Sequence, residues 1–554
     1  MKSLIYTAVL LAVLVACVVV LRSIDGEQRS SIPAVSTTPA VKSEPPLESG
    51  FDSDSFEDSD ATELYAAGVE LFSLWHVREA TRLFERAVAA DSSRYGAWVR
   101  LVECYAHPLV GREDDAVAAL RVARGTRVSD ADTTFLAGIE QLFVVRDSGA
   151  AVELLERAVQ TEVSHENAVY YYALALMQSG RVEDAANRVE DLVRRDETVG
   201  RFVELSVRCR VEAGDLGAAG DEARELARMY AEEPFPYVLL AMVEEMAGRH
   251  TAAVEFCNNA LVLDSKYIPA ILARANLYAS AGQFEAARVS FEKLLMFEDP
   301  VLRSLGHEGI GFVDLLSGRF NRGLEELDEA IRAAMLAGSV RHGLAISARL
   351  VGHLCELGQG DEAVAVVDRW VTGFGDIPVG LAGYRVSILE GDMKAANVVL
   401  GEIQSSKAWS EWMSMMAMDY IELVALAHIR AEEYNAALAI LSSAGRGVRP
   451  GARDFLGGYA AFQSGGAETA SEAFAAVGRR FYTVEFPYHG DPVRFVRSLY
   501  YLGDANLARG NEAEAVVYYK RFLDYWGDAD WDVQAVARAR EKLESLTSTP
   551  SSPD

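Results

Sequence analysis

Apolar positions recur with a helical period from residue 166 onward. They stand three and four residues apart, on one face of a predicted helix, at Val169, Tyr172, Ala173 and Leu176. Gly180 follows this helix, and a helix end commonly needs a residue that tolerates positive φ. A second apolar face then appears at Ala185, Val189 and Leu192. The stretch therefore predicts two packed helices joined by a turn.

This pattern repeats with a fixed period of 34 residues. The predicted turn glycines are Gly180, Gly214, Gly248 and Gly282. Each is followed five residues later by a small residue, at Ala185, Ala219, Ala253 and Ala287. A fixed period of this length indicates a stack of helical repeats.

The period and its small residues resemble the tetratricopeptide repeat, a helix-turn-helix unit with small residues at its eighth, twentieth and twenty-seventh places. Residues 61–94 fit it with Gly68, Ala80 and Ala87, and Trp98 stands where the family has its signature tryptophan. We expect about thirteen repeats between residues 61 and 545. The resemblance, to the bacterial membrane-anchored type, implies an all-α, right-handed superhelical solenoid. Each repeat of such a solenoid should contact only its neighbours.

The repeats divide into a regular and an irregular array. Residues 61–300 keep the period, whereas in residues 301–545 the turns are spaced unevenly and the last helix is expected to be a polar cap. An aromatic, proline-containing loop is predicted at 476–495, packed over the preceding helix pair or available to a ligand. Residues 546–554 are predicted to be a disordered tail.

The start of the chain carries an uncharged apolar run at residues 4–21. A helix of about 18 residues spans about 27 Å, close to the thickness of a bilayer core. We favour a retained signal anchor or transmembrane helix over residues 1–22. Two alternatives stay open: a lipoprotein signal in which Cys17 is lipidated, and a cleaved secretory signal.

A linker is expected at residues 23–60. It is rich in proline and serine, ends in the acidic run FDSDSFEDSD, and has too few large apolar residues to fold alone. The positive charges flanking the apolar run are nearly balanced, so orientation is weakly determined. We prefer a single-pass protein with its repeats on the extracytoplasmic, periplasmic side.

Composition and motifs argue against several classes of function. The formal net charge is −29, which argues against nucleic acid as a partner. There is no phosphate-binding loop, nucleophile elbow or zinc-binding helix motif, so no cofactor, metal or catalytic residue is predicted. Cysteines within separate repeats are expected to be buried free thiols, at Cys104, Cys209, Cys257 and Cys355.

The resemblance implies that first-helix residues of each repeat line a concave, partner-binding face. Carried over place by place, the candidates are Asn167, Tyr170, Tyr171, Arg201, Glu204, Arg208, Met242, Glu245 and Asn276. Tyr and Arg often anchor interfaces. The residues by which some family members grip a terminal carboxylate are absent from the matching places.

These observations favour a membrane-tethered scaffold that binds a protein or peptide on its concave face. The alternative is a sensory or regulatory partner of a bacterial signalling system, because the last repeat resembles those of such proteins. An enzyme is a third and weaker interpretation. The pattern leaves the oligomeric state open.

Overall fold

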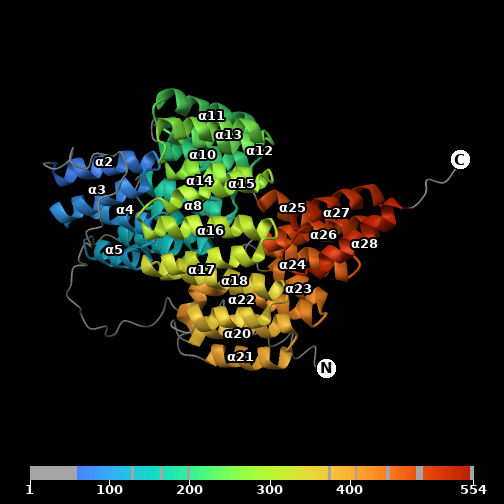
Figure 1. Ribbon diagram of the computed structural model, residues 1–554. Helices are drawn as coiled ribbons and strands as arrows, with labels where there is room; N and C mark the ends of the chain where they lie inside the picture. The colour runs from blue at the N-terminus through green and yellow to red at the C-terminus, as the bar shows by residue number, and fades with distance from the viewer. Residues whose placement is uncertain are drawn as a thin grey trace. The chain divides into compact units, whose positions relative to one another are not determined.

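The computed structural model describes residues 59–126, 130–161, 166–195, 200–371, 376–405, 409–443, 450–481 and 491–548. Throughout these ranges every regular element is helical, and no strand occurs in them. The prediction of an all-α helical repeat protein is confirmed. Helices that follow each other in sequence pack side by side as pairs (Figure 1).

The helices fall into two sets according to their place in a pair. The first helices are α2 (Ala61–Ser73), α4 (Tyr95–Ala106), α6 (Asp130–Ile139) with its π-helical continuation η2 (Glu140–Val145), α8 (Glu166–Ser179), α10 (Gly200–Glu212), α12 (Phe235–Met246), α14 (Ile268–Ser280), α16 (Pro300–Leu316), α18 (Val340–Glu356), α20 (Asp376–Glu390), α22 (Trp409–Arg430), α24 (Pro450–Gln463) and α26 (Pro492–Ala508).

The second helices are α3 (Val77–Ala90), α5 (Glu113–Thr126), α7 (Ser148–Gln160), α9 (Val182–Arg195), α11 (Leu216–Met229), α13 (His250–Leu263), α15 (Phe284–Leu295), α17 (Phe320–Leu336), α19 (Gly360–Val366) with π-helical η3 (Val367–Val371), α21 (Met393–Ser405), α23 (Tyr434–Ser443), α25 (Ala467–Phe481) and α27 (Glu512–Trp526). A last helix, α28 (Gln534–Thr547), follows the final pair.

First and second helices differ in burial. In α10 nearly every residue is buried, whereas α11 buries only Ala219, Gly220, Ala223 and Leu226. A helix that is buried on several sides lies inside the stack, and one with a single apolar stripe covers it. The first helices therefore form an inner layer and the second helices an outer layer.

The turn inside each pair has the conformation that the sequence pattern predicts. Gly180, Gly214, Gly248 and Gly282 all have positive φ, between 71° and 85°. Three other pairs have a residue with a side chain in the same conformation, namely Trp75 (φ 62°), Arg146 (φ 63°) and Glu432 (φ 60°). The matching small residue still follows five places later, at Ala80, Ala151 and Ala437, all fully buried. These three residues keep the repeat geometry at a backbone cost of about 1 kcal/mol each.

The expectation that each repeat contacts only its neighbours is wrong for this chain. The turn between α2 and α3 lies against α12 and α14, where the Tyr267 hydroxyl donates to the Leu74 carbonyl at 3.1 Å. Arg78 of α3 forms an ion pair with Asp299, which begins α16. Apolar side chains on the inner layer are covered by these distant repeats, so the chain buries part of its own inner face.

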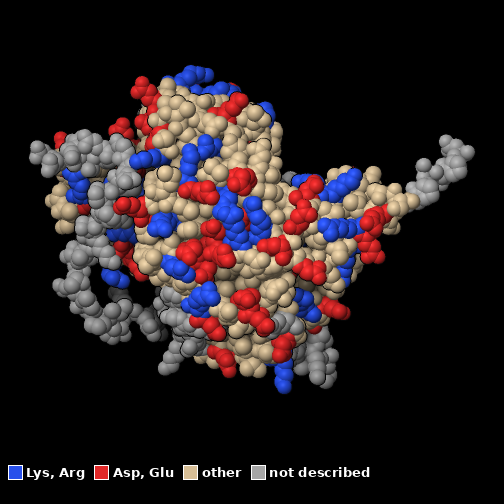
Figure 2. All heavy atoms as spheres, in the orientation of Figure 1, with Lys and Arg blue, Asp and Glu red and all other residues tan. Residues whose placement is uncertain are grey.

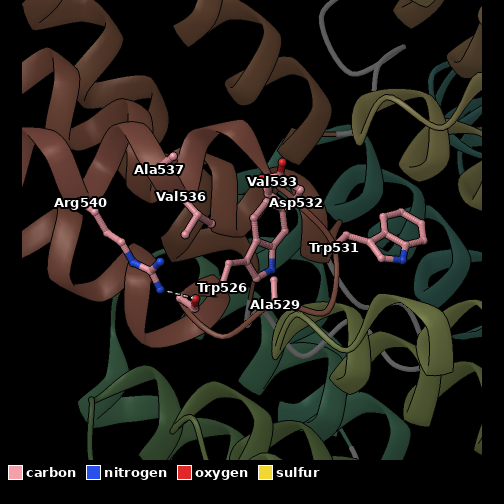
Figure 3. Close-up of a pocket in the computed structure, with 9 residues that line it drawn as sticks. Trp526, Ala529, Trp531, Asp532, Val533, Val536, Ala537 and Arg540 are labelled. Atoms are coloured by element: carbon pink, nitrogen blue, oxygen red, sulfur yellow. Dashed lines mark hydrogen bonds between the residues drawn. The ribbon is translucent and has the colours of Figure 1, made fainter.

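The C-terminal repeats make a second contact of this kind, with α16 and α17. The indole nitrogen of Trp526 donates to the Leu315 carbonyl at 3.0 Å, and Asp530 accepts from the backbone nitrogen of Phe320 at 2.8 Å. Beside this contact lies a cavity of about 160 Å³, which includes Trp526 and Arg540 in its lining (Figure 3). In this view Trp531 points away from Trp526, toward α17, where its ring nitrogen donates to Asn321.

Several predicted segments lie wholly or mostly outside the described residues. These are the apolar run at 4–21 with Cys17, nearly all of the linker at 23–60, and the end of the tail. None of the helices that the structure describes is both long and apolar enough to cross a bilayer. The predicted loop at 476–495 is partly helical, since α25 continues to Phe481 and α26 begins at Pro492. Buried Val477 and Val493 explain why both helices reach into it.

Candidate partner-binding surface

All nine predicted partner-binding residues lie on four inner helices, α8, α10, α12 and α14. Neighbouring members of this set pack against each other, α8 on α10, α10 on α12 and α12 on α14. The residues separate into two groups. Five are buried, namely Tyr170, Tyr171, Arg201, Glu204 and Glu245, and four are half-buried, namely Asn167, Arg208, Met242 and Asn276.

The buried group begins with a polar network between α4 and α8. Arg100 donates to the Tyr171 hydroxyl at 2.8 Å and to the side-chain oxygen of Asn167 at 2.7 Å. It also pairs with Glu103 at 3.0 Å. Tyr171 is 0% exposed, and burial raises the pKa of its hydroxyl well above the usual value. Its hydroxyl is thus kept neutral, and its side chain is in contact with other residues of the chain and not with solvent.

Arg201 extends this network onto α10. It donates to Asn167, and its guanidinium lies 4.6 Å from the centre of the Tyr170 ring. Burial, reinforced by the positive charge of Arg100, lowers the pKa of Arg201. Two of its nitrogens, Nε and Nη1, have no hydrogen-bond partner within the described part of the chain. Burying a cation in this way is costly unless neighbours compensate it, so the network stays intact only while its members are packed together.

Arg100 and Glu103 are members of this network that the sequence analysis did not single out. A usable signal was present. With Trp98 in the family's signature place, these residues fall at the sixth and ninth places of the same helix. The place-by-place assignment that gave Tyr171 and Arg208 would therefore also have given Arg100 and Glu103, had it been applied to the second repeat.

Three residues of the second group form a row that solvent reaches. Arg208, Met242 and Asn276 stand 34 residues apart, so they occupy one place on three adjacent inner helices, and each is half-buried. We call these three residues the inner row. The next places toward the helix ends are Glu212, Met246 and Ser280, of which Met246 is 38% exposed.

Two buried carboxylates lie in the same inner helices, and one of them contacts the inner row. Buried Glu204 accepts from Arg208 at 3.1 Å and so orients its guanidinium. Burial raises the pKa of Glu204, although the ion pair with Arg208 opposes the rise. Glu245, also buried, contacts His250 and accepts from the Ser280 hydroxyl at 3.3 Å. Glu204 thus orients a member of the inner row, whereas Glu245 contacts residues outside it.

The amide oxygen of Asn276 stands out within the inner row. It has no hydrogen-bond partner within the described ranges. A buried acceptor without a partner costs free energy, and a donor brought by a ligand would recover it. Since this oxygen is itself buried, Asn276 would accept a ligand's hydrogen bond only after its side chain turns toward solvent.

Figure 2 shows Lys and Arg interspersed with Asp and Glu on the face in view. Within the described residues no group of three or more His, Cys, Asp or Glu is arranged to hold a metal ion. The four cysteines predicted to be buried thiols are buried and form no disulfide with one another, which confirms that expectation.

The comparison with protein families agrees with the repeat pattern over part of the chain. The sequence model of the tetratricopeptide repeat matches residues 142–199 and 172–237. No curated protein matches the chain. A crystal structure of a tetratricopeptide repeat protein from Parabacteroides merdae is 13% identical, with the match covering 46% of this chain and 98% of that one at a TM-score of 0.31. The crystal structure of yeast Tom70 is 11% identical, covering 90% of this chain and 97% of that one at a TM-score of 0.30.

Proposed function

We propose that this chain, which contains tetratricopeptide repeats, is a scaffold that holds a protein or peptide partner on its inner row. The observation that carries the proposal is the placement of Arg208, Met242 and Asn276 at one position of three adjacent inner helices. Side chains repeated at one place along a stack form a linear surface. Such a surface suits an extended segment of another protein.

The chemistry of the row defines what it would hold. Arg208, oriented by Glu204, offers charged donors to a carboxylate. Met242 offers a flexible apolar contact, which adapts to side chains of different shape. Asn276 offers an acceptor for a backbone N–H. A segment with an acidic residue on one side of an apolar one would use all three.

The test is recovery of partners by the tagged full-length protein from its native membranes. A variant carrying Arg208→Ala, Met242→Ala and Asn276→Ala should lose the partner, with affinity falling about a hundredfold if each change costs about 1 kcal/mol. Tyr170 and Tyr171 are unsuitable for this test, because their loss would disturb the buried network as well.

The outer helices supply a matched control. Asp221, Glu255 and Val289 are also 34 residues apart, at one place of three adjacent outer helices, and all are exposed. Changing these three to Ala should leave partner recovery unchanged. Equal recovery by both variants and the wild type would show that the inner row is not the binding surface.

We further propose that residues 4–21 tether the scaffold to a membrane, with the repeats on the extracytoplasmic side. The support is the length and apolar character of this run. A variant lacking residues 1–22 should leave the membrane fraction, and persistence there would reject the tether. Lipid labelling that globomycin blocks, and that Cys17→Ser abolishes, would assign the lipoprotein alternative instead.

A further inference from the structure

The turn between α2 and α3 covers part of the inner layer next to the inner row. Its residues Leu74, Trp75 and His76 each contact a different inner-layer group. The Leu74 carbonyl accepts from Tyr267, the Trp75 ring stacks on Phe235 at 6.1 Å, and His76 lies 3.2 Å from a Glu233 oxygen. Phe235 and Tyr267 are 2% and 3% exposed as a result.

Trp75 is an unusual residue for its position. It stands where four regular repeats have glycine, with the same positive φ. A bulky aromatic residue in that conformation is a genuine outlier, and such outliers persist where surrounding contacts compensate them. Here the ring contacts Phe235 and, edge-on at 5.8 Å, His107. The compensation therefore comes from the next repeat, through His107, and from a distant repeat, through Phe235.

This contact lies close to where two of the hydrophobic cores meet. One core runs from Leu64 to Cys209, and the other takes nearly all its members from Val203 onward. Among described residues before Val203, only Leu74 and Leu109 belong to the second core. The first repeats are connected to α12 and α14 through the consecutive packing of helices up to α10. Beyond that, their direct apolar contact with α12 and α14 thus depends on a small set of side chains.

From this arrangement we propose that the Leu74–His76 turn occupies a binding site for a partner on the surface formed by the starts of α12 and α14. It must leave before a partner can extend from the inner row onto that face. The partner segment that replaces it presents an aromatic side chain beside a cationic one. This inference rests on the proposed function, because it supposes a partner on the neighbouring row.

The contacts of the Leu74–His76 turn indicate which groups a partner segment needs in order to replace it. An aromatic ring would take the place of Trp75 on Phe235, and a backbone carbonyl would accept from Tyr267 as the Leu74 carbonyl does. A cation would face Glu233, where His76 now lies. An extended peptide supplies its own carbonyls, so its sequence needs to provide only the ring and the cation.

The electrostatics of the turn favour a cation at this place. Burial alone would lower the pKa of His76, but the hydrogen bond to Glu233 and the nearby carboxylates of Glu79 and Asp264 raise it above the ordinary value. Tyr267 is the other titratable group against it, and burial keeps that hydroxyl neutral. Glu233 and Asp264, which lie outside the α2–α3 pair, therefore attract a positive charge on whichever segment occupies the site.

Hydrogen–deuterium exchange of the full-length protein tests the occupant directly. Trp75→Gly removes the ring while supplying the residue that the turn conformation prefers, so the α2–α3 pair should stay folded. We expect exchange over residues 233–241 and 267–273 to become about fivefold faster. Glu432→Gly is the matched control, because Glu432 has the same φ in another turn and is exposed. It should leave exchange over these residues unchanged.

A peptide tests the chemistry of the replacement. The probe is a fluorescent peptide with the chain's own sequence from residue 70 to residue 80, ELFSLWHVREA. It should bind the Trp75→Gly protein at least about fivefold more tightly than the wild type, because the wild-type face is occupied. A peptide with Ala in place of its tryptophan should lose this binding.

Two results would overturn the inference. One is unchanged exchange over 233–241 and 267–273 in Trp75→Gly and also in Tyr267→Phe, which removes only the hydroxyl that donates to Leu74. The other is equal peptide affinity for wild type and Trp75→Gly. Both readouts use the isolated protein, so they can fail while the inner-row variant still loses its native partner, and the two proposals are judged separately.

Discussion

Replacing Arg494 with methionine should destabilise the contact between α26 and the inner helices α18, α20 and α22. Arg494 is 3% exposed and lies between two buried carboxylates. Its Nε is 2.8 Å from Glu356, and its Nη2 is 2.6 Å from Glu422. The whole cluster carries three cations and three carboxylates, namely Arg385, Arg494, Arg497, Glu356, Glu422 and Asp491.

The magnitude follows from the charges that the change leaves behind. Without Arg494, Glu422 keeps only Arg385, at 3.5 Å, and the cluster has one negative charge in excess. Removing one member of a buried ion pair typically costs about 3–5 kcal/mol, because the partner stays buried and uncompensated. Methionine keeps much of the apolar volume, so this cost is mainly electrostatic.

The assay is native-state hydrogen exchange, because a long repeat array does not unfold in a single two-state step. At neutral pH, amides in the middle of α22 and α26 should exchange roughly a hundredfold faster or more in the variant. Exchange in α2 and α3, which this cluster does not touch, should be unaffected and serves as the internal control.

The pH dependence separates this mechanism from simple loss of packing. Burial alone would raise the pKa of Glu422, but Arg494 and Arg385 lower it below the usual 4.5. In the wild type, Glu422 therefore stabilises the fold above its unfolded pKa, and this contribution is lost as the pH falls through its folded value. In the variant, burial dominates, so protonation of Glu422 relieves the cost as the pH falls.

The difference between variant and wild type should accordingly be full near pH 7. It should shrink as the pH falls from the raised pKa of Glu422 in the variant to its lowered pKa in the wild type. A second change, Glu422→Gln in the Arg494→Met background, should recover part of the loss at pH 7, since it removes the excess charge. A loss of stability that is the same at pH 7 and pH 4, and that Glu422→Gln leaves untouched, would refute the electrostatic reasoning.

Two further changes test packing between and within repeats. Asp530→Ala removes the acceptor that caps the start of α17, where Asp530 lies 2.8 Å from a backbone nitrogen; we expect a loss of about 1 kcal/mol in urea unfolding, and none for exposed Asp528→Ala. Gly309→Ala would place a Cβ only 2.2 Å from the ring of Phe291 and should cost about 1–3 kcal/mol. Gly383→Ala, also within an inner helix but with no atom inside 4 Å, should instead stabilise by about 0.5 kcal/mol; equal melting temperatures for these two glycine variants would contradict the packing argument.

The sequence was sufficient to predict the structural features that recur from repeat to repeat. Gly180 and its equivalents are required by the backbone at the turn, and Ala185 and its equivalents by the close approach of two helices. Both requirements are local, so the same residue types recur in successive repeats, and the 34-residue spacing reveals them. The all-α repeat fold could be predicted from these positions alone.

The candidate site was less predictable because its environment is set by distant repeats. Family places five and six put Tyr170 and Tyr171 on the inner side of α8, where they lie. The sequence could not show that Arg100 of another repeat covers Tyr171, or that Leu74 reaches Tyr267 across 193 residues. Such contacts occur once and have no period, so a pattern search does not detect them.

Trp75 shows how such a contact can still leave a trace in the sequence. The buried alanine five places later fixes the register, and in that register Trp75 replaces the turn glycine. The replacement alone is not diagnostic, because Arg146 and Glu432 make the same exchange, and Glu432 is exposed. The informative signal is the combination of an unfavourable backbone conformation with an apolar ring. Such a ring gains little free energy in water, so only burial against another surface can offset the unfavourable backbone conformation. A violation of a local rule by a residue whose side chain needs burial therefore points to a long-range contact, and here that contact lies on the face next to the inner row.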